Sequence, residues 1–498
     1  MGVVGSKIAR GSFWLSSGNI LATLIAFAGS IVIARLLTPD EYGLISAALI
    51  YPGMLIGLLD LGLNAALLRY SASRDSRVVG VAMLFKIIVA VASAMLLYMF
   101  AEQMALSLNR PGIEFYIRIL SIYAACTIVA EASIQVLIGL NRYMEASLMY
   151  VLRNVVRIVT AVALIVMGLG VYGAIWGFSA AGIAMIIYVS ILYPRELKPG
   201  PAKSVFRELI AYSLPLYIPV VLGMPLNQVA NIFLARRVSN FELGNYSVAT
   251  NFTVIISIIG GAITTSLFSV LPSINSREKA RVVVEKATRY TTLIMVSLAL
   301  GLVVLAKPIV YLVYGHRYAE APLYLALLAL TPLLAPLGTY VVAPFLNSIG
   351  KTRDTMKINL VYQAVFVPLA VALIQPLGVT GLIISLLLGN LASALYGVRL
   401  VERDYGIKIV KRDNLLLLVK ACIPAVLTFS MLHYIQASIT AQLLIRALVY
   451  ALSLTLIVSR TLRDDEIIEL ENMTKSVKVL SIVLNPLFKL VLMLNRVK

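Results

Sequence analysis

The chain has 498 residues, of which 60% are hydrophobic and only 13% are charged. A soluble domain of this length cannot bury so much apolar surface, so the composition excludes a soluble protein and indicates an integral membrane protein. The formal net charge of +19 would suggest nucleic acid in a soluble chain. Here we expect no nucleic-acid partner, because membrane topology accounts for the charge.

Runs of roughly 20 mostly apolar residues, the length that crosses the hydrocarbon core, recur along the whole chain. They predict an all-α membrane protein with about fourteen transmembrane helices, at 12–34, 44–68, 78–100, 115–140, 145–168, 171–193, 209–234, 243–269, 289–313, 320–348, 356–375, 378–398, 414–434 and 441–460. The first run is too long for the core of a cleaved signal peptide and lacks a small-residue cleavage site, so we expect it to be the first span.

Lys and Arg are unequally divided between the two sides of the membrane that these spans define. With the N-terminus in the cytoplasm, most of them fall in the N-terminal segment, the even-numbered loops and the C-terminal tail. This is the positive-inside pattern. It predicts a multi-pass protein of the cytoplasmic (inner) membrane with both termini in the cytoplasm.

The chain also contains an internal repeat. The segment ARLLTPDEYGLISAA (34–48) matches ARRVSNFELGNYSVA (235–249) at six of fifteen positions, and LGVYGAI (169–175) matches LGVTGLI (377–383) at five of seven. A weaker third pair, IGLNR and IGKTR, follows the same order at a similar offset. The offset corresponds to six spans, an even number, so the two halves enter the membrane in the same direction.

The repeat predicts two pseudo-symmetric six-helix bundles with two more helices after them. The expected parts are an N-terminal bundle, a cytoplasmic linker, a C-terminal bundle, spans 13 and 14, and an amphipathic cytoplasmic tail, at 1–193, 194–208, 209–398, 399–462 and 463–498. Two such bundles form a cleft that rocking exposes to either side, which is typical of transporters. Helix-weakening residues at equivalent depths in spans 1 and 7 predict a hinge at Gly18, Pro215, Pro219 and Pro225.

Five charged residues lie well inside the N-terminal bundle, where an unpaired charge costs at least ~2.5 kcal/mol. Helix rise puts Asp60 and Lys86 at one depth, and Glu131 and Arg153 at another. These are either structural ion pairs or, for Asp60 and Lys86, ion-coupling residues. Arg157 lies one turn from Arg153 and has no carboxylate left to balance it. Two arginines at this spacing can clamp a phosphate, so Arg153 and Arg157, with Glu131, are candidate binding residues for an anionic head group.

Span 7 is rich in amides rather than charges. Asn227, Gln228 and Asn231 in this span, and Asn19 in span 1, are candidate binding residues for sugar hydroxyls. The alternative interpretation is that these side chains hydrogen-bond one helix to another.

These features resemble a known family. The twelve-plus-two helix count, the turn ARLLTPDEYG after span 1, DLGL in span 2 and NSIGKTR at the end of span 10 are similar to the polysaccharide transporter (oligosaccharide flippase) family. That family belongs to the MOP superfamily, with the MATE exporters and the lipid II flippases. The resemblance implies a MATE-like fold and a flippase that moves a polyprenyl-linked oligosaccharide to the outer leaflet for O-antigen, exopolysaccharide or other surface glycan assembly. The implied partners are this lipid-linked substrate, membrane lipids, and glycan polymerases or glycosyltransferases of the same pathway.

Two related functions stay open as alternatives. MATE-type drug exporters commonly use a carboxylate in span 1 or span 7, whereas both spans here lack Asp and Glu in their apolar cores. Lipid II flippases generally carry charges within span 1, where Asn19 is here the one polar residue at depth. Both alternatives therefore match the residues less well than an oligosaccharide flippase does.

Catalysis is not expected. The outer loops are short, and the two histidines, His316 and His433, lie far apart without metal-ligand spacing. We therefore expect no catalytic residue, no metal and no cofactor.

Overall fold

The computed structural model describes residues 2–192, 202–270, 277–432 and 437–461, and in these ranges it is helical without strands. The helices in chain order are α1 (Gly2–Leu36), α2 (Pro39–Ala48), α3 (Ile50–Leu58), α4 (Leu63–Ala72), α5 (Ser76–Met99), α6 (Ala101–Ser107), α7 (Glu114–Gly139), α8 (Tyr143–Leu164), the π-helical η1 (Ile165–Leu169), α9 (Gly170–Leu192), α10 (Ala202–Arg237), α11 (Asn240–Val270), α12 (Arg277–Val313), α13 (Ala321–Leu328), the 3-10 helix η3 (Thr331–Leu337), α14 (Val342–Ser348), α15 (Thr352–Tyr405), α16 (Arg412–Leu432) and α17 (Ile439–Ser459).

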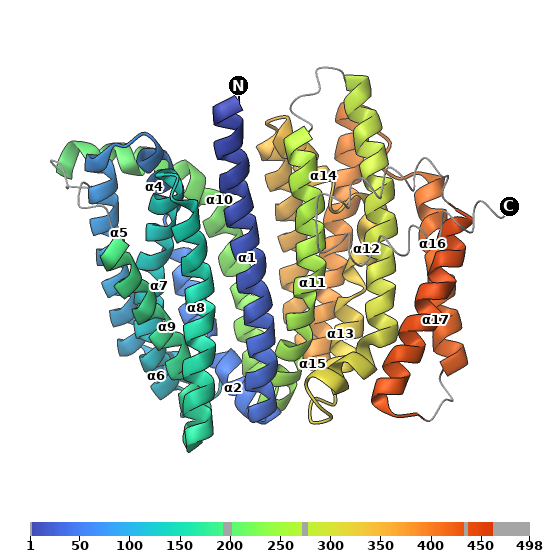
Figure 1. Ribbon diagram of the computed structural model, residues 1–498, viewed down its shortest axis with the longest axis horizontal. Coiled ribbons are helices and arrows are strands. Elements are labelled where there is room, and N and C mark those ends of the chain that lie inside the picture. Colours follow the sequence, from blue (N-terminus) through green and yellow to red (C-terminus); the bar gives the residue numbers. More distant parts are fainter. Residues whose placement is uncertain (1, 193–201, 271–276, 433–436, 462–498) are drawn as a thin grey trace. The chain divides into compact units, whose positions relative to one another are not determined.

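The chain divides into two compact units. Unit 1 comprises Met1–Asn251 and Val367–Leu382, and unit 2 comprises Phe252–Phe366 and Ile383–Lys498. Within unit 1, α8 packs against α1 and α9, and α7 packs against α5 and α9, with their axes roughly parallel (Figure 1). The six-helix bundles at 1–193 and 209–398 were inferred from the sequence repeat. That they form separate domains stays a prediction.

Ten helices of the described residues are long and apolar enough to cross a membrane, or eleven if one bent helix pair counts as a single span. Two of these segments, of 50 and 54 residues, each contain a reversal at glycines with positive φ: Gly168 and Gly170 in the first, Gly378 in the second. A Cβ added to Gly177 would meet the Arg157 carbonyl oxygen at 2.6 Å, so α9 runs back along α8. The predicted span boundaries fall at both reversals. The chain is a multi-pass membrane protein, while the count of fourteen stays a prediction.

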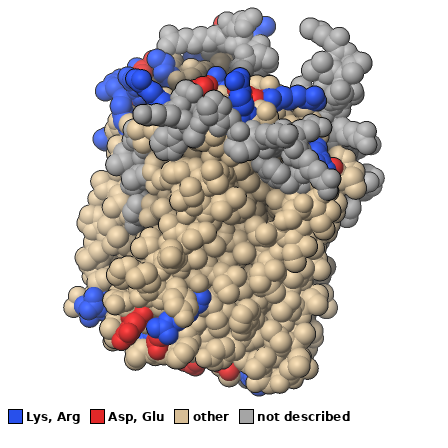
Figure 2. Space-filling view, turned by 90° about the vertical axis from the view of Figure 1, so that its left-hand side faces the viewer, with Lys and Arg blue, Asp and Glu red and all other residues tan. Residues whose placement is uncertain are grey.

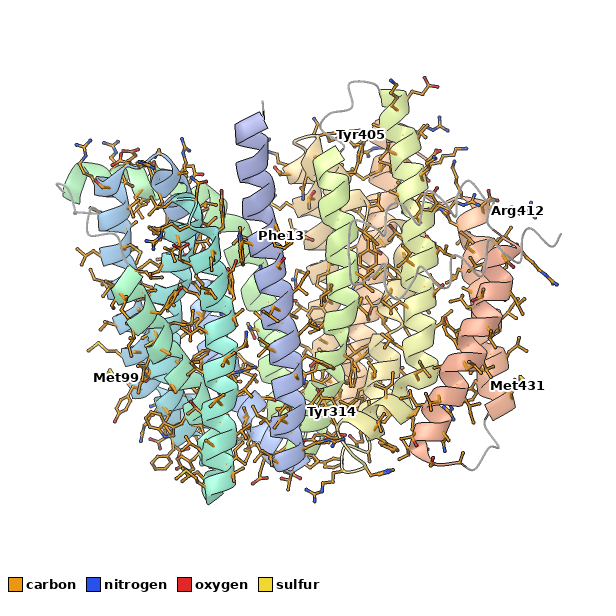
Figure 3. All side chains as sticks on the ribbon, viewed as in Figure 1. Phe13, Met99, Tyr314, Tyr405, Arg412 and Met431 are labelled. Carbon is orange, nitrogen blue, oxygen red and sulfur yellow. The ribbon has the colours of Figure 1, made fainter. Side chains whose placement is uncertain are left out.

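The outer surfaces of the helices are apolar. The side chains of Met99 on α5 and Met431 on α16 are 70% and 64% exposed (Figure 3). Figure 2 shows one face on which charged residues gather near the two ends, with an uncharged band between them. Such a band is what lipid tails require of a protein surface.

Span 2 is broken, whereas the sequence predicted one helix over 44–68. The helix α3 ends at Leu58 and α4 begins at Leu63, with positive φ at Leu61 (53°) and Gly62 (70°) between them. The hydroxyl of Tyr217 on α10 donates to the Leu58 carbonyl that the break leaves free. The prediction of an unbroken helix was therefore wrong at the DLGL motif, because a neighbouring helix satisfies the freed backbone.

Asp60 lies in this break and is held by Lys86 of α5. The Lys86 Nζ donates to Asp60 Oδ1 at 2.7 Å, and the two side chains are 2% and 28% exposed. The ion pair thus fixes an irregular segment of span 2 to a regular helix. The lysine is the more deeply buried of the two charges.

The repeated turns begin α2 and α11 in the same way. Thr38 and Glu41 form a capping box at the start of α2, and Ser239 and Glu242 repeat its hydrogen bonds at the start of α11. Each box satisfies amides that would otherwise be unpaired at a helix N-terminus. The shared Glu in the two sequence segments therefore caps a helix in both copies.

These two helix starts also contact each other. A Cβ on Gly43 would overlap the carbonyl oxygen of Asn240, and a Cβ on Gly244 would overlap that of Pro39. We call this contact of Pro39 and Gly43 with Asn240 and Gly244 the glycine crossing. Because the contacts are reciprocal, the two copies pack as related surfaces about a local pseudo-two-fold axis.

Polar contacts reinforce the glycine crossing. Ser247 Oγ donates to Ser46 Oγ at 2.7 Å across 201 residues, the offset of the repeat. Arg110, which is 8% exposed in the loop before α7, donates to the Val238 carbonyl at 2.8 Å and to Asn240 Oδ1 at 2.6 Å. A cation at the C-terminus of α10 also suits the helix dipole.

The structure gives Gly18 a packing role. The helix α1 is continuous through Gly18, and a Cβ there would meet the Ser147 Cβ of α8 at 2.5 Å. Pro215, Pro219 and Pro225 lie within α10, but their side chains are outside the described residues. The hinge stays a prediction. Most of the predicted linker and the tail at 463–498 also lie outside the described residues.

We predict that Gly43→Ala lowers the stability of the protein by about 1–3 kcal/mol, because the new methyl group must displace backbone atoms of α11. Gly53→Ala is the matched control, since Gly53 is also helical and a Cβ there meets nothing within 4 Å. Thermal unfolding of the two variants in detergent measures the difference. Equal unfolding midpoints would show that the glycine crossing is not tightly packed.

We also predict that Asp60→Asn costs more stability than Lys86→Met. The first change leaves the more deeply buried charge unpaired, and breaking a buried ion pair typically costs about 3–5 kcal/mol. The double variant should recover most of this loss, because no charge then remains. A double-mutant cycle on unfolding midpoints tests the prediction, and additive losses would contradict it.

Candidate functional site

Unit 1 holds a row of charged side chains that begins at the break in span 2. Beyond the Asp60–Lys86 pair, Glu131 of α7 lies within electrostatic range of Lys86. Glu131 Oε1 accepts a hydrogen bond from Arg153 Nη1 of α8 at 2.8 Å, with both side chains 27% exposed. The two pairings expected from helix depth are therefore present. Their role in ion coupling stays a prediction.

Arg157 ends this row with a different environment. Its guanidinium carbon lies 5.1 Å from the centre of the Phe178 ring of α9. The hydroxyls of Tyr42 and Tyr123 lie within electrostatic range of it. Among the described residues no carboxylate forms a salt bridge with Arg157, and its Nε is buried without a hydrogen-bond partner. The row of five charges thus has two anions, three cations and an excess of one positive charge at Arg157.

Arg153 and Arg157 are not equivalent, although the sequence suggested one clamp made of both. Arg153 is already paired with Glu131, and its guanidinium carbon lies 5.7 Å from the Tyr150 ring centre. The buried Nε of Arg157 has no hydrogen-bond partner, whereas Arg153 donates to Glu131. An anion at this point would bind Arg157 directly, and the neighbouring positive charge of Arg153 would attract it. Their role in binding stays a prediction.

The aromatic walls of this site were missed from sequence. Tyr42 precedes Gly43 in the repeated turn, and its hydroxyl accepts a hydrogen bond from Asn251 Nδ2 of α11 at 3.2 Å. Tyr123 of α7 packs edge-on against Phe178, with ring centres 5.4 Å apart. The position of Tyr42 in the repeated segment was a signal that could have pointed to this residue. For Tyr123 and Phe178 no such signal existed, because aromatic residues are common throughout these apolar helices.

The amides predicted for sugar binding have simpler surroundings. Asn231 Nδ2 donates to Gln228 Oε1 at 3.1 Å, a contact within one turn of α10. The side chains of Asn227 and Asn19 are exposed. A role for these four residues in sugar binding stays a prediction. No group of His, Cys, Asp and Glu side chains in the described part of the chain could hold a metal ion.

Comparison with known proteins finds a matching family, a curated relative and several solved structures. A family model described as "Polysaccharide biosynthesis protein" matches residues 32–323, more than half of the chain. The succinoglycan biosynthesis transport protein ExoT of Rhizobium meliloti is 23% identical over 337 residues, which cover 64% of this chain. The chain spans 65% of that relative, just under two thirds of its length.

Solved structures show the same fold. The lipid II flippase MurJ, in an inward closed conformation, matches with a TM-score of 0.73 at 14% identity, over 91% of this chain and all of that one. An inward-facing multidrug resistance MATE family transporter of the MOP superfamily matches with 0.65 at 17% identity, over 77% of this chain and 94% of that one. A MOP superfamily transporter from Pyrococcus furiosus matches with 0.57 at 17% identity, over 80% and 95%.

The predicted all-α, MATE-like membrane fold is therefore confirmed, since structural likeness at such low identity establishes the fold. The family model supplies the relationship by sequence. The chain belongs to the polysaccharide biosynthesis protein family.

Proposed function

We propose that the protein is a flippase, which translocates a polyprenyl phosphate- or pyrophosphate-linked oligosaccharide across the cytoplasmic membrane by alternating access. The observation that carries this proposal is Arg157, a cation inside membrane-spanning helices that no carboxylate in the described residues neutralises. Such a charge is costly at membrane depth and marks a binding path for an ion or substrate. A phosphate group would supply the missing negative charge.

The surroundings of Arg157 suit this cargo. The Phe178 ring and the two tyrosines lower the local polarity, which strengthens the attraction between a guanidinium and a phosphate. Arg153 places a second guanidinium nearby, whose charge is balanced by its ion pair with Glu131. The relatives support the same direction, since one is named as a transport protein of succinoglycan biosynthesis and another as a lipid II flippase.

The wider assignment follows from the same proposal. The protein acts by moving its substrate rather than by catalysis, and its partners are the lipid-linked oligosaccharide, membrane lipids, and the glycan polymerases or glycosyltransferases that use the same precursor. It lies in the cytoplasmic membrane with both termini in the cytoplasm. The excess of Lys and Arg in the loops of that side supports this orientation.

A cation-coupled drug exporter is the second candidate, and the charge pattern disfavours it. Such a transporter needs a carboxylate free to exchange one cation for another. In unit 1, Asp60 and Glu131 are both held by basic side chains at 2.7 and 2.8 Å. The available charge in the row is positive, which favours an anionic substrate.

Deletion of the gene, with analysis of lipid-linked glycans, tests the function in cells. A flippase predicts that finished oligosaccharide accumulates on its carrier in the cytoplasmic leaflet, because it cannot leave. Single repeats exposed on the outer leaflet would indicate a polymerase instead. Unchanged lipid-linked glycans would contradict both.

Complementation of the deletion then tests the site. Arg157→Gln should fail to restore surface glycan, since it removes the charge that offsets the phosphate. Arg118→Gln is the matched control, because Arg118 of α7 also stacks on aromatic rings, at 5.6 Å from Tyr98, and has a buried Nε without a partner. With equal protein levels, full complementation by Arg157→Gln would remove the basis for the anion site.

A further inference from the structure

The first half of α10 packs on helices of the other repeat copy. By sequence α10 belongs to the second copy, because its end carries the repeated segment that starts at residue 235. It nevertheless packs against α3, α4 and α5 of the first copy. Leu209 is fully buried there, in one apolar cluster with Leu63 and Leu67 of α4. The equivalent helix of the first copy, α1, packs instead against α8 of its own half. The contact of α10 with α3 and α4 is therefore a contact between repeats.

This contact is centred on the break in span 2. The Tyr217 hydroxyl donates to the Leu58 carbonyl that the break leaves free. A Cβ on Gly62 would overlap the carbonyl oxygen of Ser213, so the backbones of α10 and the break touch. The positive φ of Gly62, 70°, and its missing side chain both serve this close approach.

The contact extends along α10 toward its N-terminus. The Tyr70 hydroxyl of α4 donates to Glu208 Oε1 at 2.9 Å, and the ring of Tyr70 packs edge-on against that of Tyr212. The guanidinium carbon of Arg69 lies 4.5 Å from the centre of the Tyr212 ring. We call the whole contact the inner clamp, formed by Glu208, Leu209, Tyr212, Ser213 and Tyr217 of α10 with Leu58, Gly62, Leu63, Leu67, Arg69 and Tyr70.

We infer that the inner clamp is the cytoplasmic gate of the transport path and that Tyr217 holds it shut. This inference rests on the proposed function and its orientation, which puts the loop after α4 in the cytoplasm and the glycine crossing on the outer side. When two repeats rock against each other, the contacts between them on one side must separate to open that side. The glycine crossing is such a contact on the outer side, and the inner clamp is its counterpart on the inner side.

The polar contacts of the inner clamp are suited to release. A carbonyl freed inside a membrane protein needs a hydrogen-bond partner, and Tyr217 supplies it to Leu58 while the clamp is closed. Water that enters from the cytoplasm on opening can take its place at little cost. The hydrogen bond of Tyr70 with Glu208 is already exposed, so water can replace it as well. Burial of Leu209 then favours the closed state.

The predicted hinge would let the inner clamp open by itself. Pro219 and Pro225 lie between Tyr217 and the end of α10 at Arg237, which leads into the glycine crossing. Prolines allow a helix to bend where they remove its hydrogen bonds. A bend at these positions would move the first half of α10 away from span 2 while the glycine crossing stays closed. Alternating access requires such separate opening of the two sides.

Chemical labelling at Ser213 measures how often the inner clamp opens. Cys126 and Cys422 are replaced by Ser, and Ser213→Cys is introduced, because Ser213 is 1% exposed and its Oγ has no hydrogen-bond partner. In vesicles with the cytoplasmic face outward, an impermeant maleimide reaches this thiol when the clamp opens. Tyr217→Phe should raise the labelling rate roughly 2- to 10-fold, the effect of losing one typical hydrogen bond.

Tyr51→Phe is the matched control for this experiment. Tyr51 also lies on α3, but its hydroxyl is hydrogen-bonded to Ser107, within the first copy. Its loss should leave the labelling rate unchanged. Tyr70→Phe, which removes the hydrogen bond with Glu208, is a second variant of the inner clamp in case Tyr217→Phe does not fold.

A reversible cross-link tests whether the inner clamp is a gate. In the chain without native cysteines, Tyr70→Cys and Glu208→Cys are joined by a flexible bismaleimide with a reducible linker. The protein is reconstituted in vesicles with a fluorescent polyprenyl pyrophosphate-linked oligosaccharide, and an impermeant quencher reports movement between leaflets. We expect the cross-link to stop this movement and reduction to restore it. Tyr51→Cys with Ser107→Cys joins two helices of the same copy, so its cross-link should leave transport unchanged.

The outcomes separate the gate from the proposed function. No movement of the lipid before cross-linking would overturn the flippase function, on which the gate rests. Movement that continues at the same rate after the inner clamp is cross-linked would overturn the gate and leave the flippase function standing. Equal labelling rates in Tyr217→Phe and Tyr51→Phe would overturn the role of Tyr217 in holding the gate shut.

Discussion

A charge inside a membrane must be balanced, and this requirement organises unit 1. Four of the five charged residues deep in its helices form two ion pairs, at 2.7 and 2.8 Å. Arg157 is the fifth, and in the described structure it has aromatic neighbours but no carboxylate partner. Charges at such depth persist where they face a substrate or ion path. The imbalance at one arginine thus connects the helix packing to the proposed transport of a phosphate-bearing lipid.

The same need for partners applies to the polar groups of the backbone. Where span 2 breaks, Tyr217 satisfies the free carbonyl and Lys86 holds the aspartate exposed by the break. Where α2 and α11 begin, paired capping boxes satisfy the first amides of each helix. In the hydrocarbon core such partners are obligatory, and at the exposed helix starts the caps take the place of water. The irregular places in unit 1 are therefore also its most specifically bonded places, and the glycine crossing is one of them.

Sequence alone predicted the fold class, most span boundaries and the two ion pairs. These features depend on the length of apolar runs and on the rise per residue of a helix, and both can be read along the sequence. The repeat at residues 34–48 and 235–249 was visible too, but only as a sign of two related halves. Its direct contact through Gly43 and Gly244 was not predictable, since sequence similarity shows related parts and not that they touch. The break at Leu61 and Gly62 was missed because the residues on both sides of it are as apolar as those of an unbroken membrane-spanning helix. Tyr42 was missed because its hydrogen-bond partner, Asn251, is far from it in sequence.

Transport by the purified protein tests the central claim most directly. The full chain is reconstituted in vesicles with a fluorescent polyprenyl pyrophosphate carrying an oligosaccharide, and an impermeant quencher reports its movement between leaflets. We expect the intact protein to move this lipid, Arg157→Gln to lose most of that activity, and the matching uncharged polyprenyl glycoside to stay in place. Equal movement of the charged and uncharged lipids, or no movement of either, would contradict an anion-recognising flippase.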